Sequence, residues 1–371
     1  MDFSLTDDQQ ELQGLARRIL DDRVTHDHLK EVEAGDGLDT STWDELAKAG
    51  FVGIACSSDV GGGGLGFLEV AVVLEEIGRH VAPVPYLSSV VTGMLAVDRF
   101  GNDDQRREVL PDAIAGTALL SGALSEEANP DRGRPATTAT PPARGHGAWT
   151  LTGAKHFVPW ASSARLLLVP ATTDDGTAVF LVECGATGLS RNDHRTTDRQ
   201  QVSTVTLDHT PGMPLGSAEE RSAVLPWMLD LASAALCVVQ AGVCERALRM
   251  TADYTIGREQ FDHPIASFQA VSQRAGDAYI DTLAVQLTAW QAAWRLAEGL
   301  PATDEIRIAK FWAADGASRV LHAASHLHGG IGVDVDYPLH RYFNWARWIE
   351  LSLGSGSEQL VALGASMAAE A

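Results

Sequence analysis

The chain has little cysteine and little positive charge. Its four cysteines, Cys56, Cys184, Cys237 and Cys244, show no CxxC spacing, which argues against a zinc site or a disulfide framework and favours reduced thiols buried in a core. The 28 Lys and Arg residues stand against 49 Asp and Glu, a net charge of −21. Because such a charge repels phosphate backbones and anionic lipids, nucleic acid and membrane surfaces are not expected partners.

Targeting and membrane signals are also missing from the sequence. The first residues, 1–6, form neither the basic stretch nor the apolar stretch of a secretory signal, and no uninterrupted apolar run reaches the roughly 18 residues of a membrane span. We therefore expect a cytoplasmic protein. Apolar residues are abundant overall, at 45% of 371 residues, which is enough for two or three domains with buried cores.

Residues 1–116 read as a domain of short helices. Thr6 and Gln9 have the spacing of a capping box, and Ser41–Asp44 begins a second helix. A strongly apolar helix follows the glycines at 61–64, and further helical patterns cover 90–99 and 103–115.

Residues 117–217 change to short apolar runs bounded by turn residues, which is typical of β-strands. The predicted strands are 118–124, 149–151, 166–169, 178–182 and 202–207. The stretch 129–147 is rich in Pro, Arg, Thr and Gly, and we expect a mobile loop there.

Residues 218–371 return to long helical patterns, at 222–256, 266–296 and 303–327. These segments are apolar on more than one face, so they must pack on each other and on another chain. The predicted fold class is α+β, with an N-terminal helical domain, a middle β barrel or sandwich, and a C-terminal four-helix bundle.

Two local motifs stand out in the last domain. The first runs from Arg258 through Gln260, Phe261 and Ile265 and continues into Phe268 and Gln269. Arginine offers a planar donor fork for phosphate, and an exposed phenylalanine offers a flat apolar face. The second motif runs from His326 and Leu327 to Gly329 and Gly330, where glycine lets another molecule approach the backbone closely.

With this domain order, the two motifs resemble those of acyl-CoA dehydrogenases over nearly the whole chain. In that family, an Arg-x-x-Phe-Gly-x-Pro-Leu stretch and a Gln-x-x-Gly-Gly-x-Gly stretch contact the FAD of the partner subunit. The resemblance therefore implies that Arg258, Gln260, Phe261, Ile265, Phe268, Gln269, His326, Leu327, Gly329 and Gly330 bind FAD. Asp262 replaces the usual Gly, and His326 replaces the usual Gln, although either side chain can hydrogen-bond a cofactor.

The family's catalytic glutamate, which removes the substrate's α-proton, is missing from both of its usual places. The first place is 23 residues after Gly330 and holds Leu353; the second is 26 residues before Arg258 and holds Ala232. Asp230 lies roughly 200° around the helix from Ala232 and would face elsewhere. Glu358 would reach the first place only through a register shift that Gly354 opposes.

The segments that contact the family's own flavin ring are altered as well. The usual Thr-Glu-Pro is Ser125-Glu126-Glu127, and the usual Trp-Ile-Thr is Phe157-Val158-Pro159. Proline has neither an N–H nor a hydroxyl, so Pro159 cannot donate to the flavin. The segments that would serve a partner's FAD are therefore kept, while those that would serve the chain's own flavin are eroded.

This pattern predicts a non-catalytic, FAD-completing subunit of a heteromeric α2β2 acyl-CoA dehydrogenase. The resemblance is to the glutamate-lacking subunits that act with a glutamate-bearing partner on steroid side-chain CoA thioesters, with electron-transfer flavoprotein as the usual acceptor. Two alternatives stay open. One is a self-sufficient flavoprotein, either a dehydrogenase that uses Glu126 or Glu358 as its base or a family member diverted to oxidase or monooxygenase chemistry; the other is a scaffold that does not touch FAD.

Two further patterns have some of the residues of known binding sites. His322 and His326 share a helix face, but Ala323 stands where a zinc protease needs its glutamate, so no metal site is expected. The glycines at 61–64 lack the Lys-Ser/Thr of a P-loop. In the resembling family a comparable loop lies near the acyl pocket, and a flexible turn is the other interpretation.

Overall fold

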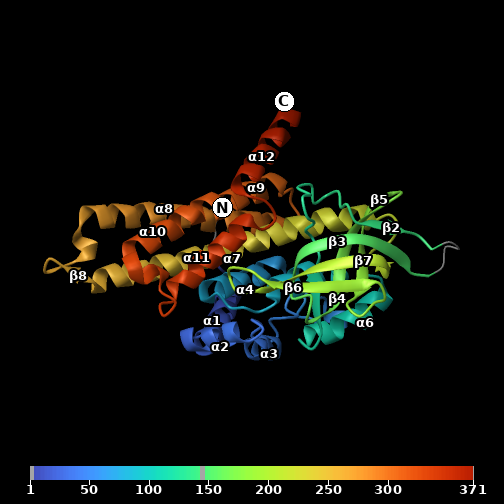
Figure 1. Ribbon diagram of the computed structural model, residues 1–371, viewed down its shortest axis with the longest axis horizontal. Helices are drawn as coiled ribbons and strands as arrows, with labels where there is room; N and C mark the ends of the chain where they lie inside the picture. The colour runs from blue at the N-terminus through green and yellow to red at the C-terminus, as the bar shows by residue number, and fades with distance from the viewer. Residues whose placement is uncertain (1–3, 143–146, 371) are drawn as a thin grey trace. The chain divides into compact units, whose positions relative to one another are not determined.

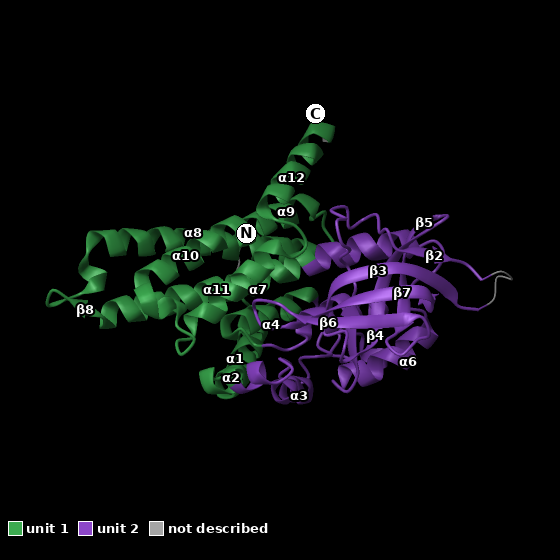
Figure 2. Cartoon of the chain, viewed as in Figure 1, with its two compact units in different colours: residues 1–30, 67–82, 233–371 green, residues 31–66, 83–232 purple. Residues whose placement is uncertain are grey.

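The computed structural model describes residues 4–142 and 147–370 (Figure 1). The chain folds into two compact units, shown in Figure 2. Unit 1 comprises Met1–Lys30, Phe67–Ala82 and Ser233–Ala371, and unit 2 comprises Glu31–Gly66 and Pro83–Ala232. Each unit therefore gathers stretches from more than one of the three predicted segments. The order of helices, then strands, then helices confirms the predicted α+β class.

The strands of unit 2 pair into a seven-stranded sheet that closes on itself. Its strands are β1 (Leu119–Gly122), β2 (Thr138–Thr140), β3 (Trp149–Pro159), β4 (Ala164–Thr173), β5 (Gly176–Glu183), β6 (Leu189–Arg195) and β7 (Gln201–Pro214). The pairings run β4-β2-β3-β7-β5 and return from β5 to β4, while β1 extends β4 and β6 lies along β7. A barrel results, and its core is filled by alternating side chains such as Leu151, Leu167, Phe180 and Val205.

Two of these strands were not predicted. The strand β2 lies inside the stretch 129–147 that was expected to be a loop, and it pairs with β3 from Thr138 to Thr140. That expectation is wrong for this part of the stretch, while residues 143–146 lie outside the described residues. The strand β6 is exposed along nearly its whole length and carries few apolar residues, so it gives no alternating pattern to detect.

Along the chain, the helices of unit 2 come before and after the strands of the barrel. They are α3 (Thr40–Lys48), η1 (Ser58–Val60), the π-helical η2 (Tyr86–Met94), α5 (Leu95–Phe100), α6 (Asp103–Ile114) and the beginning of α7 (Arg221–Gly257). The helix α2 (His26–Ala34) was not predicted because it buries only Leu29. The cap of α3 is Asp39, whose carboxylate accepts from the Thr42 N–H at 3.0 Å, so the expected start at Ser41 is corrected by two residues.

Unit 1 is helical. Its helices are α1 (Asp7–Arg23), α4 (Phe67–His80), the rest of α7, α8 (Gln269–Ala297), α9 (Thr303–Phe311), the π-helical η4 (Trp312–Gly316), α10 (Ala317–His328), α11 (Leu339–Leu351) and α12 (Gly356–Glu370). The predicted capping box of α1 is confirmed, with Thr6 and Gln9 bonding each other's backbone N–H. Figure 1 shows α8 and α10 side by side, with the β8 hairpin at one end of them.

The helices α4 and α7 cross with their backbones almost in contact. A Cβ added at Gly78 would lie 2.0 Å from the Val239 carbonyl oxygen, and one added at Gly242 would lie 2.0 Å from the Glu75 carbonyl oxygen. Any larger residue at either position would push the helices apart. This crossing fixes the middle of α7, the helix that carries the first motif at its far end.

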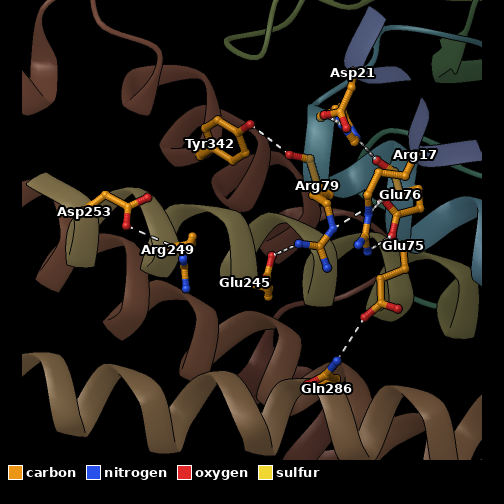
Figure 3. A network of polar contacts seen from close by, with 11 residues as sticks. Arg17, Asp21, Glu75, Glu76, Arg79, Glu245, Arg249, Asp253, Gln286 and Tyr342 are labelled. Atoms are coloured by element: carbon orange, nitrogen blue, oxygen red, sulfur yellow. Dashed lines mark hydrogen bonds and ion pairs between the residues drawn. The ribbon is translucent and has the colours of Figure 1, made fainter. Parts of the chain in front are cut away.

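A network of charged side chains surrounds this crossing (Figure 3). The buried Glu76 on α4 pairs with Arg17 of α1 at 2.7 Å and with Arg79, which also pairs with Glu245 of α7. Beside it, Glu75 accepts from the Gln286 amide of α8 at 3.2 Å. Burial raises the pKa of Glu75 above its usual range, opposed by the charge of Arg79.

The helix α7 corrects one expectation from the sequence. Averaged over a window, it is long and apolar enough to cross a membrane by length and composition, although no uninterrupted apolar run had suggested this. However, 61% of that window is buried in the structure. We interpret α7 as a core helix, whose apolar character reflects packing on several sides.

Candidate functional site

The first motif forms a β-hairpin with a two-residue turn directly after α7. The strands β8 (Glu259–Gln260) and β9 (His263–Pro264) pair, and Phe261 and Asp262 form the turn with φ of 54° and 64°. Positive φ at both central positions is the signature of a type I′ turn. Aspartate tolerates this conformation better than most residues, which explains why Asp262 can stand where glycine is usual.

The side chains of this hairpin point away from their own chain. Phe261 is 86% exposed and lies edge-on to Phe268, with ring centroids 6.4 Å apart. Arg258, Gln260 and Gln269 are exposed, whereas Ile265 and Phe268 are half-buried and anchor the hairpin. Within residues 4–142 and 147–370, no hydrogen bond or ion pair of the Arg258 guanidinium is found. Its donors are therefore available to a group outside the described chain.

The second motif lies at the end of α10. His326 is exposed and Leu327 is buried, and the helix ends at Gly329, which has a φ of 63°. A Cβ added at Gly330 would meet nothing within 4 Å, and the φ of this residue is not in the positive range. Nothing in the described structure requires glycine at this position. A glycine here leaves the backbone open to the close approach of another molecule.

The structure brings the two motifs together through an aromatic cluster that the sequence interpretation missed. The buried His328 ring stacks on Tyr254 of α7, with centroids 4.5 Å apart and an interplanar angle of 21°. Its Nε2 lies 3.1 Å from the Tyr337 hydroxyl. Tyr254 also accepts the Arg258 N–H through its carbonyl oxygen at 2.8 Å. The only available signal was the one-turn spacing of Tyr254 and Arg258, which does not reveal the contact to α10.

The position of the usual glutamate lies in a tightly held loop after α11. Leu353 has a φ of 53°, a strained value for a leucine. The buried Lys310 ammonium donates to the carbonyl oxygens of Ile349 and Gly354, both at 2.9 Å, and of Glu350 at 3.3 Å. The loop conformation is therefore maintained, but the side chain at its tip cannot accept a proton.

Glu358, the alternative carboxylate near the first of these positions, has a structural role. Glu358 accepts the Ser355 N–H at 2.6 Å, and its own N–H donates to the Ser355 hydroxyl at 3.4 Å, so it closes the N-terminus of α12. Ala232, at the second usual position, is buried in α7 with 1% exposure.

Glu126 is the most strongly engaged carboxylate in the barrel. It accepts from the Lys155 ammonium at 2.6 Å, from the Thr137 hydroxyl at 2.7 Å, from the Asn129 amide at 3.0 Å and from the Ala136 N–H at 2.5 Å. Its side chain is 6% exposed and that of Lys155 is 1% exposed. Burial raises the pKa of Glu126, but the bonds from Lys155, Asn129 and Thr137 outweigh it and lower the pKa to about 2. Such a carboxylate is a poor proton acceptor.

The altered flavin-edge segment lies on β3 at a bulge between Lys155 and Val158. Phe157 protrudes there with 68% exposure and a φ of 52°. The carbonyl oxygen of Pro159 accepts the Ser121 hydroxyl at 2.6 Å. This segment therefore presents an apolar ring and no donor from residue 159, in line with the sequence analysis.

The glycine loop at 61–64 is held by backbone contacts. The N–H groups of Gly63 and Gly64 donate to the carbonyl oxygens of Gly53 and Cys56 at 2.9 and 2.8 Å. A Cβ at Gly62 would lie 2.1 Å from the Cys56 carbonyl oxygen. The close fit within unit 2 accounts for the glycine at this position.

The His, Cys, Asp and Glu side chains of the described residues bear on metal binding and on nucleophilic chemistry through their positions and pKa shifts. Within the described ranges, no group of three or more His, Cys, Asp or Glu side chains is placed to hold a metal ion. All four cysteines are free thiols. Burial raises the pKa of Cys184 to about 11 and those of Cys56 and Cys237 to about 12, so these thiols are poorly reactive at neutral pH.

The chain has a helical segment, then a closed β-barrel, then a long helical segment that carries the hairpin motif and the Gly-Gly motif. This arrangement defines an acyl-CoA dehydrogenase type of protein. Comparison with known families agrees: residues 6–117 match the acyl-CoA dehydrogenase N-terminal domain, and residues 223–367 match its C-terminal domain. The chain belongs to the acyl-CoA dehydrogenase family.

Individual relatives cover the whole chain. Acyl-CoA dehydrogenase FadE27 of Mycobacterium tuberculosis is 39% identical over 379 aligned residues, covering 99% of both chains. A solved structure of a variant of the Tcur3481-Tcur3483 steroid ACAD is 43% identical with a TM-score of 0.92, covering 98% of both. The structure of the ChsE4-ChsE5 complex from Mycobacterium tuberculosis is 39% identical with a TM-score of 0.93, covering 99% of both.

Acyl-CoA dehydrogenases use FAD, so the residues of the two motifs can be compared with what an FAD-binding site needs. The available guanidinium of Arg258 suits a diphosphate, and the open backbone at Gly330 suits the close approach of a nucleotide. The residues present therefore fit this cofactor.

Proposed function

We propose that this chain is the non-catalytic, FAD-completing subunit of a heteromeric α2β2 acyl-CoA dehydrogenase. The observation that carries the proposal is a contrast within the chain. The segments that face outward keep their motif residues apart from Asp262 and His326. Both positions of the usual glutamate, in contrast, hold aliphatic side chains, Leu353 and Ala232. The alternative carboxylates, Glu126 and Glu358, are engaged in an ion pair and a helix cap.

In this proposal the residues that hold the partner's FAD are the ten assigned by the resemblance. The guanidinium of Arg258 would bond the diphosphate, Phe261 would pack on the cofactor, and the backbone at Gly329 and Gly330 would lie against it. FAD supplies the acceptor for the β-hydride of the acyl-CoA substrate. The glutamate that removes the α-proton, and the acyl-CoA itself, would belong to the partner's site.

An exposed face of α8 supports docking of that partner. Exposed residues recur at alternating spacings of four and three along it: Gln269, Gln273, Gly276, Ile280, Leu283 and Leu287. An alternation of four and three is the spacing at which one helix packs along another, and the apolar part of this seam is Ile280, Leu283 and Leu287. Ile280 is 64% exposed and Leu287 is 49% exposed, and a Cβ at Gly276 would meet nothing within 4 Å. Because the seam begins at Gln269, next to the hairpin, the proposed occupant is the glutamate-bearing subunit whose FAD the hairpin contacts.

The names of the relatives support the finer part of the proposal. One similar structure is a complex of two named chains, and another is described as a steroid ACAD. We therefore propose CoA thioesters of steroid side chains, as in cholesterol side-chain β-oxidation, as the substrate class. Electron-transfer flavoprotein as the acceptor, a cytoplasmic location, and domain boundaries at 1–116, 117–217 and 218–371 are part of the same proposal.

The test is flavin content and dehydrogenase activity with and without the partner. Expressed alone, the chain should bind little or no FAD and show no activity. Co-expression with a glutamate-bearing acyl-CoA dehydrogenase subunit of the same organism should restore both, with one FAD per heterodimer.

The variant Arg258→Ala should lower the flavin content of the complex without preventing assembly. Arg249→Ala is the matched control, because Arg249 is also an exposed arginine of this region but pairs with Asp253 on its own helix. A yellow, active homomer would disprove the proposal. Flavin content that is unchanged by Arg258→Ala would favour a scaffold that does not touch FAD.

A further inference from the structure

The two segments proposed to contact FAD come from different helices, and a contact at one cluster links them. The hairpin follows α7, and the Gly329–Gly330 turn follows α10. Between them lies the His328 ring, which is 3% exposed. On one side it stacks on Tyr254 of α7 at 4.5 Å, and on the other its Nε2 meets the Tyr337 hydroxyl at 3.1 Å.

The hydrogen bonds of His328 fix which nitrogen carries the proton. Its Nδ1 lies 2.8 Å from the Ala324 carbonyl oxygen, which can only accept, so Nδ1 is the donor. The Nε2 of a neutral ring must then accept, and the Tyr337 hydroxyl donates to it. Burial lowers the pKa of His328, opposed by the bond to Ala324, so the neutral ring is favoured at neutral pH.

Both neighbours of this ring are connected to a FAD-contact segment. The carbonyl oxygen of Tyr254 accepts the Arg258 N–H at 2.8 Å, at the base of the hairpin. Tyr337 lies in the loop after the 3-10 segment η5 (Gly329–Val333), where its N–H donates to the Asp334 carbonyl oxygen at 3.1 Å. His328 itself directly precedes Gly329.

We propose that His328 is a positioning residue that ties the end of α7 to the Gly329–Gly330 turn and so sets the spacing at which both segments grip the shared FAD. This inference rests on the proposed function. It adds a residue that would touch no cofactor and would act through Tyr254 and Tyr337.

The test compares variants in the co-expressed heteromer. His328→Phe keeps a ring to stack on Tyr254 but removes both hydrogen bonds, and Tyr337→Phe removes the shared bond from its other side. His322→Phe is the matched control: His322 is on the same helix and bonds the carbonyl oxygen one turn back, that of Ser318 at 2.7 Å, but it is exposed. The readouts are the FAD dissociation constant, assembly, the melting temperature and amide hydrogen exchange of the FAD-free complex.

The expected result is a rise in the FAD dissociation constant of roughly fivefold for each of His328→Phe and Tyr337→Phe, the fold-change of the one neutral hydrogen bond between His328 and Tyr337 that both variants remove. The double variant should add little, since both changes remove the same bond. Without FAD, hydrogen exchange should speed up in both segments, 258–265 and 329–333. Tyr337→Phe removes one hydroxyl from a half-buried ring, so its assembly and melting temperature should match those of His322→Phe while its FAD binding weakens, which a purely structural role of the cluster would not allow.

Two results would overturn the inference. One is FAD binding by His328→Phe and Tyr337→Phe equal to that of His322→Phe, while Arg258→Ala loses flavin; the proposed function would then stand without it. The other is unchanged flavin in Arg258→Ala, with which both proposals fall. Should His328→Phe fail to assemble, Tyr337→Phe decides between these results, because it removes only one hydroxyl.

Discussion

Replacing Glu126 with glutamine tests whether this carboxylate has a structural or a chemical role. The substitution keeps the shape but removes the charge, which leaves the Lys155 ammonium buried at 1% exposure without its partner. Removing one member of a buried ion pair costs about 3 to 5 kcal/mol. The lowered pKa gives a similar figure: a change from 4.5 to about 2 corresponds to about 3 kcal/mol.

The assay is urea unfolding followed by circular dichroism, together with turnover per assembled complex. We expect Glu126→Gln to lower the free energy of unfolding by about 3 kcal/mol. Adding Lys155→Met should recover most of this loss, because the uncompensated charge is then gone. Turnover per assembled complex should stay unchanged. Unchanged stability with lost turnover would refute this reasoning and would favour Glu126 as the base of a self-sufficient enzyme.

The same carboxylate predicts how stability depends on pH. A group with a lowered folded pKa stabilises the fold above its unfolded pKa, and this stabilisation is lost as the pH falls through the folded value. The contribution of Glu126 should therefore be complete above about pH 4.5 and disappear towards about pH 2. Glu126→Gln should lack this acid-dependent loss, whereas an equal loss in both proteins would contradict the assignment.

Two further variants test the loop and the α8 seam. Lys310→Met removes the cation that bonds three carbonyl oxygens after α11, and it should lower the urea stability of unit 1 by about 3 kcal/mol. The exposed Lys48→Met is its control, and equal stability of the two variants would contradict the structural role. Leu283→Asp should prevent assembly with the partner in size-exclusion chromatography, whereas Leu300→Asp, also exposed but outside the seam, should not; a normal heteromer with Leu283→Asp would refute the docking surface.

Local signals in the sequence were enough to identify several elements. The capping box at Thr6 depends on residues within one turn, so the start of α1 follows from the sequence alone. The apolar strands β4 and β5 were also predicted, because both are buried on both faces and read as continuous apolar runs. By contrast, β2 is three residues long and depends on pairing with β3. No local pattern can show such a pairing.

For the candidate site, too, some features follow from the sequence and others only from the tertiary structure. The sequence by itself determined which residues can take part in chemistry, because an aliphatic side chain at 353 or 232 cannot accept a proton in any fold. The motif at 258–269 can also be identified from the sequence, because its residues are contiguous. Only the tertiary structure decided what surrounds these groups. The engagement of Glu126 by Lys155 and the stacking of His328 on Tyr254 join residues far apart in the chain. The physical reason is that burial, pKa and ring stacking depend on distance in space, which sequence separation does not determine.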